Sequence, residues 1–271
     1  MRTLPRSLAA LSLAVASSLL APAVAQAGPV TGDEILVFGN FSSSATHAAT
    51  ALTAAGHSVT NQAALPSDLR SYDSIWHVAS APGAATDEAD LIEFVESGGD
   101  LYLTGERPCC ELLNQMNENI LNALLANPTD LVGVGGLGDE AGPYVVNEDA
   151  FGGAFTTAGV GAIAPQLSGG FTWEGDPNNV YMTGAGGHGF VGGWSGSDLA
   201  EPGAGSVILV MDVDWFNATS EVADQIAAIQ SVMTEGWAGT ASAEVPLPAA
   251  APLLLVGLGA LGVVRRRRRA A

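Results

Sequence analysis

Lysine is missing from this chain, and basic residues of any kind are few. All nine basic residues are arginines, against 28 acidic residues in a chain of 271. The acidic residues all lie between Asp33 and Glu244, where Arg70 and Arg107 are the only basic ones, so this part has a formal net charge of −26. Such a surface repels phosphate groups, which argues against nucleic acid and anionic lipid as partners.

Cysteine and aromatic residues are also scarce. The two cysteines, Cys109 and Cys110, are adjacent and cannot join distant segments, which excludes a disulfide framework. Aromatic residues make up 6% of the chain, but hydrophobic residues make up 48%, which excludes wholesale disorder. Stability must therefore come from packing, and residues 28–244 are numerous enough for one domain with a core.

Both ends of the chain carry targeting patterns. Arg2 and Arg6 precede an apolar stretch, and Ala25-Gln26-Ala27 is typical of a signal-peptidase site, so we expect a signal peptide over 1–27 and cleavage between Ala27 and Gly28. Residues 245–264 form an uncharged stretch that is long enough for a membrane-spanning helix of about 20 residues. The five arginines that follow should stay cytoplasmic. The sequence therefore predicts an exported domain at the cell envelope or outside it, anchored transiently or permanently by this helix.

The order of a Val-Pro-x-Pro opening, an apolar helix and an arginine cluster resembles the PEP-CTERM class of bacterial sorting signals. The motif of its VPLPA variant matches Val245, Pro246, Leu247, Pro248 and Ala249. The resemblance implies recognition and removal of the tail by an exosortase, and a link to exopolysaccharide or biofilm matrix. An ordinary single-span anchor is the alternative, and both interpretations place the domain outside the membrane.

Short apolar runs separated by amphipathic stretches predict an α/β fold. The expected strands are continuous runs, as burial on both faces of a parallel sheet requires: Glu34–Phe38, His57–Thr60, Ser74–Ala79, Asp100–Thr104 and Ser206–Met211. Right-handed crossovers favour the strand order 2-1-3-4-5 with helices on both faces. The expected helices are Ala45–Ala55 with Ser44 as its N-cap, a helix capped by Thr86, Cys109–Leu125 and Glu221–Glu235.

A glycine-rich segment interrupts this pattern at about 131–205, which holds 21 of the 34 glycines. We interpret it as an insertion of hairpins and loops within a domain spanning 28–236, followed by a linker over 237–244 and the sorting signal over 245–271. The short strands expected in the insertion are Tyr144–Asn147, Ala154–Thr157, Phe171–Glu174 and Asn179–Thr183.

The phrases ILVFGN, LRSYDSIWHVA, GGDLYLTGE and GAGSVILVMDVDWF are similar to those of the class I glutamine amidotransferase-like fold, a flavodoxin-like parallel sheet. The resemblance implies a catalytic cysteine on the turn after a strand, with a histidine and an acid to activate it. Here Glu106 occupies that turn and no His-x-Glu pair exists. The sequence therefore favours a non-enzymatic protein. The alternative is a secreted hydrolase with a rearranged site at Cys109, Cys110 or Glu106.

Ligands of open α/β sheets bind at the carboxyl ends of the strands. The expected ligand rim there consists of Asn40, Glu106, Arg107, Asp212 and Asp214. We expect Arg107 to form a partly buried ion pair with Asp212 or Asp214, with a ligand or cation site as the alternative. Ca²⁺ is the one cofactor indicated, through the oxygens of Asp212, Asp214 and Asn217, although a capping and turn role is the competing interpretation.

Two further features leave alternatives open. Cys109 and Cys110 can be a buried pair of small residues, a reactive thiol at a helix start, or a vicinal disulfide. His188 lies among glycines, but no lysine follows and its surroundings are acidic, which excludes a phosphate-binding loop.

Overall fold

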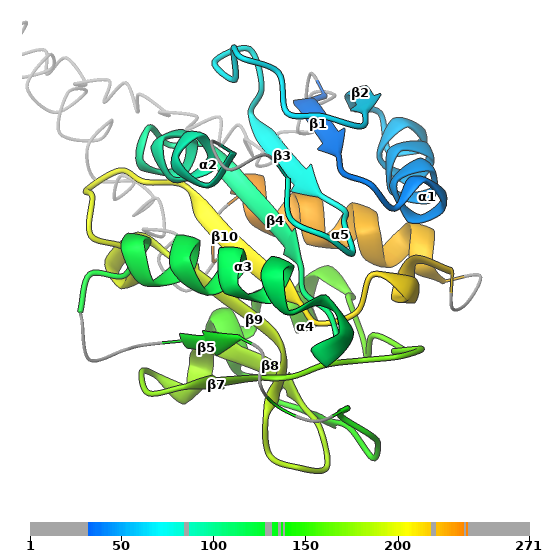
Figure 1. Ribbon diagram of the computed structural model, residues 1–271, viewed down its shortest axis with the longest axis vertical. Coiled ribbons are helices and arrows are strands. Elements are labelled where there is room, and N and C mark those ends of the chain that lie inside the picture. The colour runs from blue at the N-terminus through cyan, green and yellow to red at the C-terminus, as the bar shows by residue number, and fades with distance from the viewer. Residues whose placement is uncertain are drawn as a thin grey trace, which may run out of the picture. The chain divides into compact units, whose positions relative to one another are not determined.

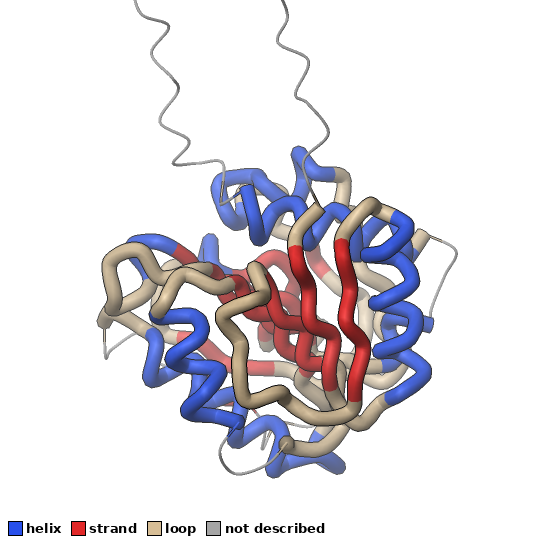
Figure 2. Tube along the Cα trace, turned by 90° about the horizontal axis from the view of Figure 1, so that it is seen from above, coloured by secondary structure: helices blue, strands red, loops and turns tan. Residues whose placement is uncertain are grey.

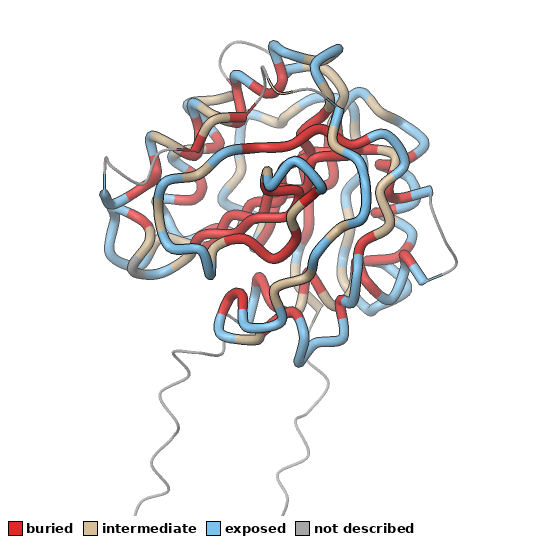
Figure 3. The backbone as a smooth tube through the Cα atoms, turned by 90° about the horizontal axis from the view of Figure 1, so that it is seen from below, coloured by how far each residue is buried: buried red, intermediate tan, exposed pale blue. Residues whose placement is uncertain are grey.

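The computed structural model describes residues 32–83, 87–127, 132–134, 137, 139–217, 221–235 and 237. The predicted signal peptide, its cleavage site, the sorting motif and the Thr86 cap lie outside these ranges. The described chain forms an α/β fold with one mixed sheet and helices on both of its faces (Figures 1 and 2). The strands make up its buried centre (Figure 3).

One half of the sheet is parallel. It contains, from edge to centre, β2 (Ser58–Gln62), β1 (Glu34–Phe38), β3 (Ser74–His77), β4 (Asp100–Thr104) and β10 (Ser206–Val210). Every neighbouring pair among them is parallel. These are the five predicted strands in the predicted order. The apolar runs of β1, β3, β4 and β10 are buried on both faces, whereas β2 lies at the edge and has no buried residue.

The helices pair on opposite faces of this half. Helices α1 (Ser42–Ala54) and α5 (Val222–Glu235) pack together, as do α2 (Asp87–Glu96) and α3 (Glu111–Leu124) (Figure 1). The predicted N-cap of α1 is wrong: the helix begins at Ser42, and Ser44 is buried inside its first turn. None of the helices in the described ranges combines the length and the apolar content needed to cross a membrane.

The other half of the sheet is antiparallel and comes from the glycine-rich insertion. Strand β9 (Gly189–Ser195) pairs with β10 and is followed across the sheet by β7 (Phe171–Trp173) and β5 (Val132–Val134). Two further strands attach to this half, β8 (Val180–Thr183) to β9 and β6 (Val145–Val146) to β8. The sheet is therefore mixed, whereas the sequence predicted a parallel one.

One prediction inside this half is wrong, and one strand was not predicted. The segment predicted as a strand at Ala154–Thr157 is a short helix, α4 (Ala154–Ala158), which packs on α5. Strand β9 was missed because Gly189, Gly192 and Gly193 break its apolar run.

Trp237 lies in the segment that the sequence predicts as a linker. Its ring centroid is 4.6 Å from that of Phe151, so the folded domain extends at least to Trp237.

Candidate functional site

The carboxyl ends of β4 and β10 bring two of the predicted rim acids together. Glu106 follows β4, Asp212 follows β10, and the two strands are neighbours. The Glu106 carboxylate accepts a hydrogen bond from the Val213 backbone N–H at 3.0 Å. Both acids are buried, Asp212 completely and Glu106 with 6% of its surface exposed.

Asp212 is held by backbone amides. Its Oδ1 accepts the Asp214 N–H at 2.7 Å, and its Oδ2 accepts the N–H groups of Gln166 and Leu167, the latter at 3.1 Å. Burial raises the pKa of Asp212 above its ordinary value, and these amide donors act in the opposite direction. Because Gln166 and Leu167 belong to the insertion, this carboxylate joins the two halves of the sheet.

Glu106 sits on a turn that α3 fixes from behind. The Glu106 N–H donates to Asn114 Oδ1 at 3.0 Å, and Asn114 Nδ2 donates to the Glu106 carbonyl at 2.7 Å. The pKa of the Glu106 carboxyl is raised to about 7, chiefly by burial; the charges of Asp212 and Asp214 act in the same direction and the amide donors in the opposite one. A carboxyl group with such a pKa can hold or release a proton near neutral pH.

The buried ion pair predicted for Arg107 is wrong. In the part of the chain that the structure describes, two ion pairs lie within 4.0 Å, His57–Asp33 and His188–Glu140, and Arg107 takes part in neither. Its guanidinium lies against the Cys109 thiol, the contact that contributes most to the raised pKa of Arg107. The physical reason is that the amides of the insertion already satisfy Asp212.

The cysteine pair lies beside this turn, in a short 3-10 helix over Pro108–Cys110. Cys109 is exposed and Cys110 partly exposed, so the interpretation as a buried pair is wrong. Both are free thiols, with a hydrogen bond of 2.8 Å between the two sulfurs. Burial of its sulfur, followed by the contact with Cys109, raises the pKa of the Cys110 thiol to about 12, which is the opposite of an activated thiolate.

The remaining predicted positions have structural partners. Asn40 Oδ1 accepts the Ser80 N–H at 3.0 Å and so joins the loops after β1 and β3. Asp214 and Asn217 bound a 3-10 helix, and Asn217 Nδ2 donates to Ser44 Oγ at 3.1 Å. The three amide protons that Asp212 accepts and the bond from Asn217 to Ser44 are the contacts expected of the turn role, and the Ca²⁺ site stays a prediction.

The insertion adds polar residues that the sequence reasoning missed. The Glu140 carboxylate is paired with His188 Nδ1 and also accepts the Gly186 N–H at 3.2 Å. The carbonyl of Glu140 accepts from Ser168 Oγ at 3.0 Å, and Ser168 Oγ lies 2.5 Å from the Tyr144 hydroxyl. Glu140, Tyr144 and Ser168 line a cavity of about 280 Å³. The one available signal was an acid and a histidine isolated in a glycine-rich segment.

Two adjacent glycines separate this group from the acidic turn. A Cβ atom at Gly169 would lie 2.4 Å from the Glu106 carbonyl oxygen, and one at Gly170 would lie 2.7 Å from Glu140 Cγ and 3.0 Å from His188 Cβ. The insertion therefore packs against the turn after β4 with no room for side chains at these positions. Glu106, the thiols and the Glu140–His188 pair consequently share one edge of the sheet.

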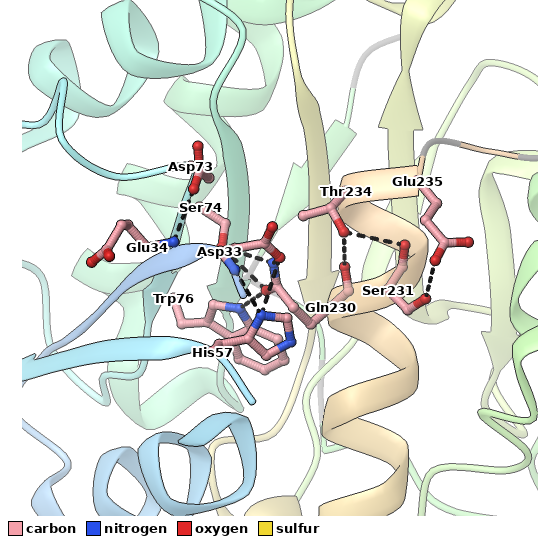
Figure 4. A network of polar contacts seen from close by, with 10 residues as sticks. All are labelled: Asp33, Glu34, His57, Asp73, Ser74, Trp76, Gln230, Ser231, Thr234 and Glu235. Carbon is pink, nitrogen blue, oxygen red and sulfur yellow. Dashed lines mark hydrogen bonds and ion pairs between the residues drawn. The ribbon is translucent and has the colours of Figure 1, made fainter. Parts of the chain in front are cut away.

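The opposite edge of the sheet holds a larger groove of about 960 Å³, whose lining includes the acidic residues Asp33, Asp73 and Asp100. Next to it, Gln230 of α5 is buried among polar partners (Figure 4). Gln230 Oε1 accepts from Trp76 Nε1 at 2.7 Å, and Nε2 donates to Ser74 Oγ at 2.9 Å and to Asp33 at 3.2 Å. These contacts fix α5 on the parallel half.

No protein-family model and no curated protein matches this chain. Among solved structures, the N-terminal domain of mmIFT52 is similar with a TM-score of 0.51 at 12% identity, covering 74% of this chain and 98% of that one. A β-galactosidase from Rahnella sp. R3 gives a TM-score of 0.47 at 14% identity and covers 76% of this chain, which spans 32% of the galactosidase. A ThuA-like protein from Bacteroides uniformis gives 0.46 at 12% identity, covering 79% of this chain and 97% of that one. At such identities the likeness concerns the fold alone.

Proposed function

We propose that this chain is an exported bacterial protein that a sorting protease of the exosortase type processes at the cell surface, where it associates with extracellular polysaccharide. Support for the sorting comes from the order of Val245–Ala249, the uncharged stretch and the terminal arginines, and support for the export comes from Ala27-Gly28. The acidic composition suits an extracellular surface and disfavours nucleic acid.

The α/β domain acts in this proposal as a binding module on an amidotransferase-like scaffold without catalysis. The observation that carries it is the state of Glu106, which stands where the resemblance implies a nucleophile. Its carboxylate faces the Val213 N–H, and within the described ranges no hydrogen bond joins a histidine to Cys109 or Cys110. A nucleophile needs such a base within hydrogen-bond reach.

The sorting is tested by intact-mass measurement of the surface protein from a host with an exosortase. We expect a mature chain that begins at Gly28 and has lost the arginine tail. The double variant Pro246→Ala, Pro248→Ala should retain the tail, whereas Pro252→Ala, outside the motif, should be processed like the parent. Recovery of the Arg265–Arg269 peptide on the mature parent protein would leave an ordinary anchor as the explanation.

A secreted hydrolase with an acid site is the second candidate, favoured by the Glu106 carboxyl with its pKa of about 7. Both candidates are compared by incubating the mature protein with exopolysaccharide from its host. Co-sedimentation without a change in polysaccharide chain length supports the binding module. Shortened chains, with the shortening abolished by Glu106→Gln, would establish the hydrolase instead.

A further inference from the structure

Three side chains at the turn after β4 point their ligand atoms at one another. A carboxylate oxygen of Glu106 and the sulfurs of Cys109 and Cys110 all lie within 4.8 Å of one another. In the described part of the chain this is the one group of three or more such residues with that geometry. It lies at the carboxyl edge of the sheet, where ligands of α/β folds bind.

The three ligand atoms can converge on a single metal ion if the two sulfurs, 2.8 Å apart, separate by about 1 Å, as tetrahedral coordination requires. Zinc binds thiolates at about 2.3 Å and carboxylates at about 2.0–2.2 Å, so small rotations of side chains within 4.8 Å of each other bring them onto one ion. Two thiolates favour a borderline or soft cation over Ca²⁺, which takes oxygen ligands. Three protein ligands leave a fourth tetrahedral position open to water or a further ligand.

The surroundings fix the backbone that carries these three ligands. Asn114 bonds the Glu106 backbone in both directions and so fixes the turn. Pro108 begins the 3-10 helix that carries both thiols. Each Glu106 carboxylate oxygen accepts one backbone N–H, from Val213 at 3.0 Å and from Arg107 at 3.3 Å, and so keeps a lone pair for a cation. The cluster differs from Asp212 in that two sulfurs converge with this carboxylate.

We propose that Glu106, Cys109 and Cys110 together bind one zinc-like divalent ion, with the fourth position open. Binding replaces the protons of the two thiols, which are released to solvent, and Glu106 binds as the carboxylate. The site requires the reduced pair, since a disulfide between Cys109 and Cys110 would remove both sulfur ligands. This inference is independent of the proposed sorting and polysaccharide association.

The test is an anaerobic titration of the full chain with Co²⁺ in a reductant that contains no thiol. We expect one equivalent to give a thiolate-to-cobalt charge-transfer band, which Zn²⁺ then abolishes by displacement. Cys109→Ser and Cys110→Ser should each weaken zinc binding by about 100-fold or more, and Glu106→Gln by about 10-fold or more, since each removes a direct ligand. Glu111→Gln, next to the pair but outside the cluster, is the matched control and should change binding by less than about 2-fold.

Several outcomes would overturn the proposal. They are the absence of the charge-transfer band, an equal effect of Glu106→Gln and Glu111→Gln, and one ion shared by two chains in sedimentation. If a variant misfolds, the metal site can still be tested in the parent protein by a second measurement. Zinc should slow alkylation of both thiols by iodoacetamide in the folded parent protein, and unchanged alkylation rates would contradict the site.

Discussion

The two halves of the sheet bury their strands by different means. In the parallel half, β10 is a continuous apolar run with every residue buried, and the same holds for most of β1 and β4. In the antiparallel half, β9 is nearly as buried although Gly189, Gly192 and Gly193 make up much of it. Aromatic rings from elsewhere cover its bare backbone, and Phe171 lies against both Gly189 and Gly192. The parallel half is buried through its own apolar side chains, whereas the antiparallel half is buried because aromatic rings pack closely over its glycines.

We expect the largest effect on the connection between the two halves from a mutation at Asp212. Asp212→Ala removes the acceptor of three backbone N–H groups, two of them in the insertion, and leaves these part-buried donors without their charged partner. We expect a loss of about 3–5 kcal/mol in the free energy of unfolding. Asp214→Asn is the control and should cost little.

Hydrogen exchange locates the damage from Asp212→Ala. Amides of Leu167 and Gly169 should exchange faster, while those of β1 and β3 keep their protection. Uniform loss of protection across both halves would show that the insertion and the parallel half unfold as one unit, which would contradict the role of Asp212 as a separate joint.

Helix α5 offers a matched pair of glutamines, one directed at each half. Gln230→Ala removes the buried bonds to Trp76, Ser74 and Asp33 (Figure 4) and should cost about 3 kcal/mol. Gln225→Ala removes the bonds from Nε2 to the carbonyls of Val160 and Ala162 and should cost about 1–2 kcal/mol. Urea unfolding of both variants measures the difference, and the reverse ranking would show that the insertion is the more strongly attached half.

The contrast between the halves also explains what the sequence predicted. The five parallel strands and their order follow from continuous apolar runs, and the positions of Glu106 and Asp212 at one edge follow from that order. The amides of Gln166 and Leu167 were beyond prediction, because no periodicity marks a loop that reaches a carboxylate 45 residues away. The predicted ion pair of Arg107 is wrong for the same reason. The scarcity of basic residues identified Arg107 and its candidate acidic partners, but backbone N–H groups distant in sequence already bond Asp212.

The glycines of β9 test the second means of burial directly. A Cβ at Gly189 would lie 2.3 Å from Phe171 Cζ, so Gly189→Ala should destabilise the fold by about 2 kcal/mol through overpacking. Combining it with Phe171→Leu, which makes room, should cost less than the sum of the two single changes. Additive effects in thermal or urea unfolding would show that the ring can move aside freely.

At the acidic edge of the parallel half, Asp100 should make stability depend on pH. Its Oδ1 accepts from the Ser206 hydroxyl and N–H at 2.7 and 2.8 Å, but burial raises its pKa from 3.8 to about 7. The native state therefore binds a proton that the unfolded chain releases, so the stabilising contribution is full below about pH 4 and is lost as the pH rises through about 7.

Asp100→Asn keeps the shape and the acceptor oxygen without the charge. We expect it to match the parent near pH 4 and to exceed it at pH 8 by on the order of 1–3 kcal/mol. Urea unfolding at pH 4, 6 and 8 measures this, with Asp90→Asn on the exposed part of the same groove as the control. A variant that is less stable than the parent at pH 8 would contradict the raised pKa.

Arg107 should give the smallest effect on stability. It is the basic residue nearest to the joint between the halves, but it forms no ion pair with Asp212 or Asp214, and its guanidinium faces the exposed thiol of Cys109. Arg107→Ala should therefore leave the urea midpoint unchanged, whereas Asp212→Ala should shift it strongly. The effect of Arg107 should appear in thiol chemistry instead, because its guanidinium contacts the Cys109 thiol. Iodoacetamide should modify Cys109 more slowly in Arg107→Ala and at nearly the parent rate in Arg107→Lys, which keeps the charge. A midpoint shift comparable to that of Asp212→Ala would show that Arg107 does form a structural ion pair. An unchanged alkylation rate would show that the guanidinium does not influence the Cys109 thiol.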